Sequence, residues 1–348
     1  MIDADRDDYW VNGYLEGGGR TGPEPCLVQD MIEPVQPLDR QFGAHPLKTV
    51  PDVLAPVLFP DDAPEAATYA VLDGALIPFL TDRLGVSGLP HESLFQDAAA
   101  AEMGDVGPWL VRLDQGSAFA RDMFTHLDDR SLWALNPGIL LRATASFEAV
   151  RRHLRRFVRI RDAQGHWFYW RFYDPATLSR YLSGPPIPRT TRLQFFEGGT
   201  ISAIFCRSDR VMAMFSVTDS DQIQRQPVVL LDEERLSFRL MMHEREADRL
   251  ARDLHRTLPD ILGARTHRES VEVLAAALVR LECYGFDRAG DREIMAAWDL
   301  VYGQPFETLD TSGQLQQLCA STGRSQDRFE RIMARMETLT RQAGEERS

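Results

Sequence analysis

The sequence has few of the features that mark secreted, membrane-spanning or disulfide-bonded proteins. Its four cysteines, Cys26, Cys206, Cys283 and Cys319, lie far apart and form neither a CxxC pair nor the dense spacing of a disulfide scaffold. No run of about 18 apolar residues occurs, so no segment is expected to span a membrane. The opening residues, MIDADRDDYW, are acidic where a secretory signal needs basic and apolar residues. We therefore expect a cytoplasmic protein with reduced thiols.

The charge balance limits the kinds of partner. The formal charge is -13 and the isoelectric point is near 5.1, whereas wrapping DNA or RNA needs a strong basic field. One basic run, RRHLRRFVRIR, is present, but its arginines lie opposite an apolar helical stripe that includes Phe147 and Leu154. That pattern is typical of a solvated helix face, with contact to an acidic protein surface as the alternative. We expect protein partners and no nucleic acid.

Motifs for catalysis and cofactor binding are equally scarce. His243-Glu244 begins like a zinc-protease helix, but Ala247 stands where the second histidine of HExxH belongs. The glycine-rich GGGRTG at 17–22 lacks the GK[ST] ending of a phosphate loop, and neither GxSxG nor a kinase signature is present. The histidines never cluster with cysteines at ligand spacing. We therefore expect no catalytic residues, no metal and no cofactor.

The length and the hydrophobic pattern predict two lobes after an N-terminal extension. At 348 residues with 44% hydrophobic and 26% charged residues, the chain is long enough for two globular cores. Residues 1–65 are rich in Asp, Gly and Pro with little periodicity, which indicates an extension draped on a neighbouring part. Residues 66–231 are predicted to form an α/β core domain, and residues 232–348 a helical lobe. The expected fold class is an α/β (α+β) N-terminal lobe with a mixed sheet, followed by an all-α C-terminal lobe.

Within residues 66–231, apolar runs alternate with helical patterns. The stretch 68–75 is predicted to contain a strand that passes into a helix, and the further strand candidates are 107–114, 136–145, 200–206, 210–217 and 226–231. Helices are expected to start at Ser117, which suits an N-cap position, and at Ser146. From about Leu231 onward the apolar residues recur at helical spacing, and glycines mark the turns between the helices.

The most unusual stretch is WFYWRFYDP, from Trp167 to Pro175. It follows Asp162-Ala163-Gln164-Gly165, which predicts the tight turn of a hairpin. Because both faces of the predicted strand are heavily aromatic, we expect a central strand that is covered on both sides. Asp174-Pro175 predicts a helix start, with Asp174 as N-cap and proline at the first helical position. A buried pair between Arg171 and Asp174 is expected to lock this joint.

An ordered set of motifs resembles the domain-of-unknown-function family 4123, the type VI secretion effector adaptors or chaperones. The set comprises Leu72-Asp73, Leu110-Val111, His153-Leu154-Arg155, Gly165 and the five residues Arg171, Phe172, Tyr173, Asp174 and Pro175, and the resemblance spans about Thr68 to Phe205. It implies an α/β lobe followed by a less uniform helical lobe. It implies no catalytic role and supplies no active-site residues.

The function that the resemblance implies is that of a cytoplasmic adaptor. Such a protein binds its cognate effector and loads it onto the valine-glycine repeat spike protein (VgrG). We expect the helical lobe to select the effector, with Tyr284, Phe286 and Trp298 as candidate partner-binding residues near its turns. Two alternatives stay open, namely an enzyme of uncharted type with an Arg171/Asp174 pocket, and a structural subunit of a larger assembly.

Overall fold

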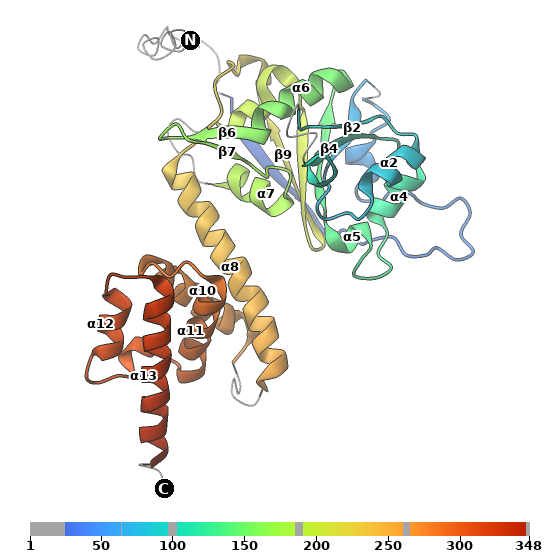
Figure 1. The fold of residues 1–348 in the computed structure, drawn as a ribbon. Helices are drawn as coiled ribbons and strands as arrows, with labels where there is room; N and C mark the ends of the chain where they lie inside the picture. Colours follow the sequence, from blue (N-terminus) through green and yellow to red (C-terminus); the bar gives the residue numbers. More distant parts are fainter. Residues whose placement is uncertain (1–24, 64, 97–102, 185–190, 260–264, 346–348) are drawn as a thin grey trace, which may run out of the picture. The chain divides into compact units, whose positions relative to one another are not determined.

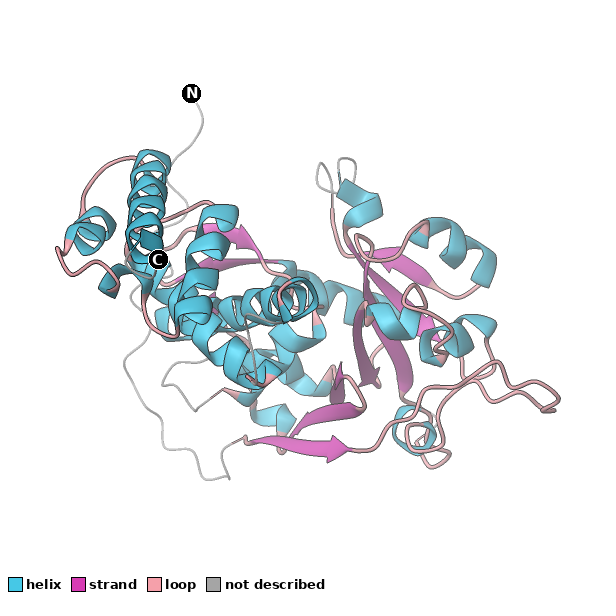
Figure 2. Cartoon of the chain, turned by 90° about the horizontal axis from the view of Figure 1, so that it is seen from below, coloured by secondary structure: helices cyan, strands magenta, loops and turns pink. Residues whose placement is uncertain are grey.

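The structure is a computed structural model of the 348-residue chain, and it describes residues 25–63, 65–96, 103–184, 191–259 and 265–345 (Figure 1). The chain divides after Leu230 into two compact units. The strands described all belong to the first unit, and the described part of the second unit, from Leu231, consists of helices and turns (Figure 2). This order confirms the predicted fold class.

A seven-stranded antiparallel sheet forms the centre of the first unit. From one edge to the other its strands are β1 (Leu27–Ile32), β9 (Val211–Val217), β8 (Ala203–Ser208), β5 (Gly138–Ala143), β2 (Ala67–Asp73), β4 (Pro108–Leu113) and β3 (His91–Ser93). In the internal strand β2, Leu72 lies opposite Trp109 on β4 and Gly138 on β5. A Cβ atom at Gly138 would lie 2.0 Å from the carbonyl oxygen of Val71, so glycine is required where these two strands meet.

Helices cover both faces of the large sheet. On one side lie α1 (Ala55–Leu58), α2 (Leu80–Ser87), α4 (Ala118–Phe124) and α5 (Leu132–Leu135), and on the other α6 (Phe147–Val158) and α7 (Pro175–Ser183) (Figure 1). Ala70 and Leu72 belong to the core under the first group, whereas Tyr69 points to the other side and contacts Phe147. Short 3-10 segments lie at Gly104–Val106, Arg192–Gly199, Ser220–Gln222 and Phe306–Thr308.

Both helices that were predicted to start at a serine do so, and each serine is the N-cap of its helix. The hydroxyl of Ser117 accepts a hydrogen bond from the Ala120 N–H at 3.1 Å, at the start of α4. The hydroxyl of Ser146 does the same for the Ala149 N–H at 3.3 Å, at the start of α6. Each serine satisfies a backbone donor that the first helical turn leaves without a partner, which explains why these helices begin where they do.

The described part of the predicted extension is built into the first unit. Strand β1 pairs with β9 from Leu27 to Ile32, and the Val35 N–H donates to the Arg210 carbonyl at 2.7 Å. Leu54 and Leu58 are fully buried in the same core as the central strands. The sequence pattern concealed this role because an edge strand has one partner only and exposes Gln29, Asp30 and Met31. Residues 1–24, including GGGRTG, lie outside the described residues.

A second, three-stranded sheet carries the aromatic stretch. Its order is β10 (Val229–Leu230), β6 (Arg159–Asp162) and β7 (Trp167–Tyr169), with β10 parallel and β7 antiparallel to β6. The predicted hairpin is confirmed: the Asp162 carboxylate accepts the N–H groups of Gln164 and His166 at 3.0 and 2.8 Å. Gly165 has a φ of 88°, a left-handed conformation that favours glycine in this turn.

The expectation of a central strand over this stretch is wrong. Strand β7 is only three residues long and lies at the edge of the small sheet. The side chains of Trp167 and Tyr169 are half exposed, at 50% and 53%, whereas Trp170 and Phe172 are buried. The aromatic stretch thus passes through two environments: its first residues form an exposed edge strand, and the following residues form a buried turn. It is not one strand that is covered on both sides.

The second unit is held by an apolar core and by a buried arginine, Arg328. Its helices are α8 (Asp232–Thr257), α10 (His267–Cys283), α11 (Ala289–Tyr302), α12 (Gln314–Ala320) and α13 (Ser325–Glu345). Its core includes Leu274, Leu278 and Leu300. Arg328 donates to the carbonyl groups of Tyr284 and Cys319 at 2.8 and 2.9 Å, which satisfies acceptors at two helix ends. Among the described residues, no helix has the length and apolarity needed to cross a membrane.

Candidate functional site

The five residues from Arg171 to Pro175 form a turn and a helix start. The Asp174 N–H donates to the Arg171 carbonyl at 3.1 Å, which closes the turn. The Asp174 carboxylate then accepts the Thr177 N–H at 2.7 Å, and Pro175 occupies the first turn of α7. The predicted helix start is confirmed. It depends on neighbouring residues only, because Asp174 satisfies a backbone N–H of the first turn and Pro175 has no N–H that would need a partner there.

The side chain of Arg171 connects this turn to the large sheet. Its guanidinium forms an ion pair with the carboxylate of Asp73, the last residue of β2. The Asp73 side chain is only 3% exposed, and its other oxygen accepts the Ala75 N–H at 3.0 Å. Partial burial alone would lower the pKa of Arg171, but the hydrogen bond and the charge of Asp73 raise it above its ordinary value. The Arg171 guanidinium therefore stays charged.

This arrangement differs from the buried Arg171–Asp174 pair that the sequence suggested. The Arg171 side chain is 56% exposed, and its ion pair reaches a residue far away in the sequence. Asp174 contributes its charge nearby, while its carboxylate caps α7. The role of Asp73 was missed, although Leu72-Asp73 stood out as a motif. The sequence signal that could have pointed to Asp73 was an acidic residue at the end of an otherwise mostly apolar predicted strand.

Tyr173 lies under this pair and is itself buried. Burial, together with repulsion from the Asp73 carboxylate, raises the pKa of the Tyr173 phenol to about 12. The Arg171 guanidinium carbon lies 6.0 Å from the centre of the Tyr173 ring. Tyr173 therefore stays protonated at neutral pH, and it is poorly suited to act as a general base there.

The remaining aromatic residues pack into a buried cluster behind the turn. Phe172 is fully buried, and its ring centre lies 6.0 Å from that of Phe157 on α6. Phe157 in turn stacks on Phe195 at 3.8 Å, and Trp170 meets Tyr181 of α7 edge-on at 4.9 Å. Such contacts stabilise a fold by about 1 kcal/mol each beyond area burial. The turn is thus fixed to α6, α7 and the following 3-10 segment.

The candidate partner-binding residues of the second unit differ in exposure. Phe286 is 1% exposed, with the Arg328 guanidinium carbon 4.3 Å from its ring centre, so its ring is not available to a partner. Tyr284 and Trp298 are half-buried, and Trp298 packs on Phe306 at 5.4 Å. Phe286 follows Gly285, and the sequence showed only an aromatic residue at a turn. Its burial depends on Arg328 from a distant helix.

The histidines of the second unit make ordinary polar contacts. His243, the first residue of the incomplete zinc motif, is buried on α8, and its Nε2 lies 2.7 Å from Glu282 on α10. His255 lies 3.0 Å from the Ser270 hydroxyl. Over the described ranges, no group of three or more His, Cys, Asp or Glu side chains is placed to hold a metal ion.

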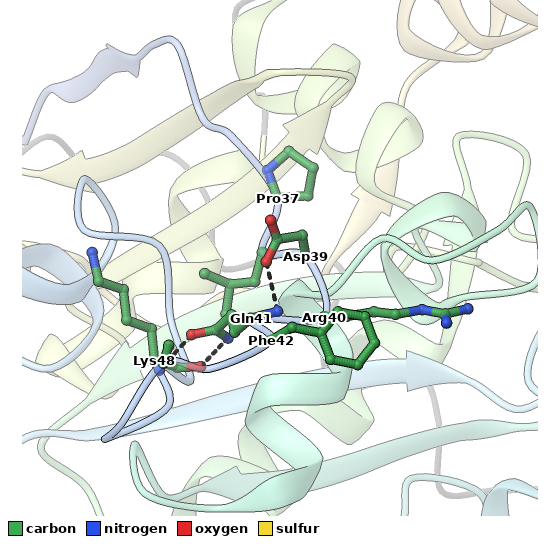
Figure 3. Close-up of a pocket in the computed structure, with 8 residues that line it drawn as sticks. Pro37, Asp39, Arg40, Gln41, Phe42 and Lys48 are labelled. Atoms are coloured by element: carbon green, nitrogen blue, oxygen red, sulfur yellow. Dashed lines mark hydrogen bonds between the residues drawn. The ribbon is translucent and has the colours of Figure 1, made fainter.

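A surface hollow of about 680 Å³ lies in the first unit, around the loop from Pro37 to Lys48 (Figure 3). The loop is closed by the Gln41 amide, which donates to the Lys48 carbonyl and accepts the Lys48 N–H, both at 2.8 Å. Arg171 and Asp174 line neither this hollow nor a cavity of about 30 Å³ beside Trp133. Neither of these two cavities is therefore the Arg171/Asp174 pocket that the enzyme alternative requires.

These features define a class of protein first: an α+β domain on an antiparallel sheet, whose aromatic turn is tied to the sheet by an ion pair, followed by a helical unit. Residues 68–189 match the family described as Domain of unknown function (DUF4123), which confirms the resemblance seen in the sequence over this part of the chain. The match begins at β2 and continues past α7, so it includes both partners of the Asp73–Arg171 pair. Neither a curated protein nor a solved structure was found to match the chain.

Proposed function

We propose that this protein is a non-enzymatic adaptor, or chaperone, that binds a type VI secretion effector and loads it onto the VgrG spike in the bacterial cytoplasm. The observation that carries the proposal is how the family residues are used. Asp73 and Arg171 join a sheet to a turn, and Asp174 caps a helix. These three polar residues thus make structural contacts, which suits a domain that presents a rigid surface to other proteins.

The two units divide the work in this proposal. The family match is confined to residues 68–189, so the helical unit from Leu231 lies outside it. A shared domain suits a partner common to many adaptors, the spike, and a unit outside the match suits the individual effector. An adaptor must also release its cargo, so we expect interfaces of about 1,600 Å² with moderate affinity and a few dominant anchors.

Helix α11 offers a surface for effector selection. Ile294, Trp298 and Tyr302 follow one another at a spacing of four residues and therefore share one face of the helix. The outer two are exposed, at 44% and 43%, and Trp298 between them is half-buried. An aromatic and aliphatic stripe of this kind is the usual anchor of a protein interface. This stripe supports Trp298 as a partner-binding residue in the proposal, whereas the buried Phe286 is no longer a candidate.

The experiment is direct binding of the purified full chain to its partners. A type VI secretion effector and a VgrG spike protein from the same bacterium are each mixed with it at about 10 μM and analysed by size-exclusion chromatography and calorimetry. We expect Ile294→Glu and Tyr302→Glu to weaken effector binding and to leave spike binding unchanged. Val86→Glu on α2 is the matched control, because Val86 is 90% exposed and lies in the other unit. If neither partner binds the wild-type chain, the adaptor proposal is wrong.

A structural subunit is distinguished from an adaptor by stoichiometry. A loading factor leaves the assembly, whereas a subunit stays in the secreted complex in a fixed ratio to the spike. Quantitative mass spectrometry of the secreted complex measures this ratio. We expect the chain to be retained with the cells and to be depleted from the secreted fraction.

A further inference from the structure

Strand β7 has backbone groups that no described residue uses. It is the last strand of the three-stranded sheet, and the Trp170 N–H that follows it donates to the Val158 carbonyl at 2.9 Å. The direction of the backbone groups alternates along an antiparallel strand. Residues 168 and 170 therefore face β6, whereas Trp167 and Tyr169 direct their N–H and C=O groups away from it. Within the described part of the chain, no other residue bonds to these outward groups.

The side chains at this edge combine aromatic surface with positive charge. Trp167 and Tyr169 lie on one face of the small sheet, opposite Arg161 and Arg159 on β6. Both guanidinium carbons lie over the Trp167 ring, at 4.4 Å for Arg161 and 5.0 Å for Arg159. The two aromatic side chains remain half exposed even so. We call this surface, formed by the outward edge of β7 and these four side chains, the Trp167 edge.

The two arginines at the Trp167 edge have no acidic partner among the described residues. Arginines on the adjoining helix α6 differ: Arg151 pairs with Glu92 and Glu148, and Arg156 pairs with Glu197. In a chain with a formal charge of -13, two uncompensated cations beside exposed aromatic rings form a local site of opposite charge. Charge complementarity therefore favours an acidic occupant.

We propose that the Trp167 edge is a docking strand for an extended acidic segment of the partner protein. The segment adds a strand to β7 through the outward groups of Trp167 and Tyr169. Neighbouring strands lie about 4.8 Å apart, so the added segment lies about 9.6 Å from β6, on the far side of β7. The long side chains of glutamate and arginine together span this distance, so carboxylates on every second residue of the segment reach Arg159 and Arg161 across Trp167 and Tyr169. Because β7 is only three residues long, it offers few backbone hydrogen bonds to an added strand. The aromatic and charged side chains therefore supply most of the selectivity. This inference rests on the adaptor function proposed above.

The test uses the full chain and a fluorescein-labelled peptide of about eight residues in which Glu and Thr alternate. We expect it to bind with a dissociation constant below about 1 mM, and a Lys/Thr peptide not to bind. Two further peptides carry N-methyl groups on the Glu or on the Thr nitrogens. The N–H groups of one set face β7, so methylation of that set is expected to weaken binding about tenfold or more, and methylation of the other set is not.

Protein variants test the same surface. We expect the Arg159→Glu/Arg161→Glu double variant to bind the peptide at least about tenfold more weakly. Arg83→Glu/Arg130→Glu is the matched control, because it makes the same change in net charge at two exposed arginines elsewhere in the first unit. Arg159→Gln/Arg161→Gln keeps the aliphatic stems and serves if the charge reversal disturbs folding, which circular dichroism checks.

Three outcomes of the peptide experiments would overturn the inference: equal binding by the Arg159→Glu/Arg161→Glu variant and the control, insensitivity to both methylation patterns, or peptide binding that tightens tenfold on deletion of residues 1–24. The last would assign the edge to the acidic start of this chain. Effector and spike binding are measured with the same variants. A partner that binds wild type and double variant equally leaves the adaptor function standing and rejects the docking strand. Peptide binding as expected, with no partner bound, supports the docking strand and rejects the adaptor function.

Discussion

Arg171 forms an ion pair with Asp73, 98 residues earlier in the chain, and this contact ties the two ends of the family domain together. The two partners differ in environment, because Asp73 is buried and Arg171 is more than half exposed. A buried carboxylate that loses its partner is costly, whereas an exposed guanidinium that loses its partner is rehydrated. Loss of Arg171 should therefore cost more stability than loss of the Asp73 charge.

We expect Arg171→Ala to destabilise the protein more than Asp73→Asn does. Removing Arg171 leaves the Asp73 charge buried, at a cost of about 2 to 3 kcal/mol. Removing the charge of Asp73 costs about 1 kcal/mol, since the exposed half of Arg171 is screened by water. Urea unfolding of the full chain measures both values.

The double variant decides whether this explanation is correct. Arg171→Ala/Asp73→Asn removes the buried charge together with its partner, so it should be more stable than Arg171→Ala alone. Arg83→Ala, at an exposed position of α2, controls for the loss of an arginine elsewhere. Additive losses in the double variant would mean that the two side chains act independently.

Asp174 gives a second test, at the other end of the same turn. Asp174→Ala removes the acceptor of the Thr177 N–H, and we expect a loss of about 1 kcal/mol in the free energy of unfolding. Asp174→Asn keeps an acceptor oxygen and should lose much less. Equal losses for the two variants would show that the charge of Asp174, and not its cap, stabilises the turn.

Local signals in the sequence were sufficient for the helix starts and the hairpin. Ser117, Ser146 and Asp174 each cap a helix by accepting a hydrogen bond from a backbone N–H three residues away. Gly165 adopts the left-handed conformation that the hairpin turn needs. The period change near Leu231 likewise follows from the spacing of apolar residues within one stretch. Interactions of this range are visible in any short window of the sequence.

Contacts between distant segments could not be read in this way. Alternation along Trp167 to Tyr173 shows aromatic side chains but not whether a strand is central or at an edge, since that depends on the neighbour it finds. The partner of Arg171 and the burial of Phe286 under Arg328 depend on residues many positions away. A single sequence carries no record of which distant residues meet.

The cysteines test the fold without any mutation of the core. Cys26 and Cys283 are exposed, whereas Cys206 and Cys319 are buried. Burial raises the pKa of the Cys206 thiol far above its usual range and that of Cys319 to about 12. We therefore expect a thiol reagent to modify Cys26 and Cys283 rapidly in the folded protein and the other two only after unfolding. Mass spectrometry of labelled peptides identifies the sites, and rapid labelling of Cys206 would contradict the packing of β8.

His153 provides the expectation for pH. It is buried in α6, and its Nε2–H donates to the Phe195 carbonyl at 2.9 Å. Burial lowers the pKa of His153 below its ordinary value of 6.5, and the nearby Arg156 charge lowers it further, although the Phe195 hydrogen bond opposes both. The unfolded chain therefore takes up this proton at a higher pH than the folded chain does.

It follows that His153 contributes stability that is fully present above pH 6.5 and is lost as the pH falls through its lower pKa in the folded state. We expect His153→Gln to be less stable than wild type at about pH 7.5 and the difference to shrink towards about pH 5. Urea unfolding across this range measures the slope. Replacement of the exposed His126 by Gln should leave the slope unchanged. A difference between wild type and His153→Gln that stays constant with pH would show that His153 acts through its shape and hydrogen bond alone.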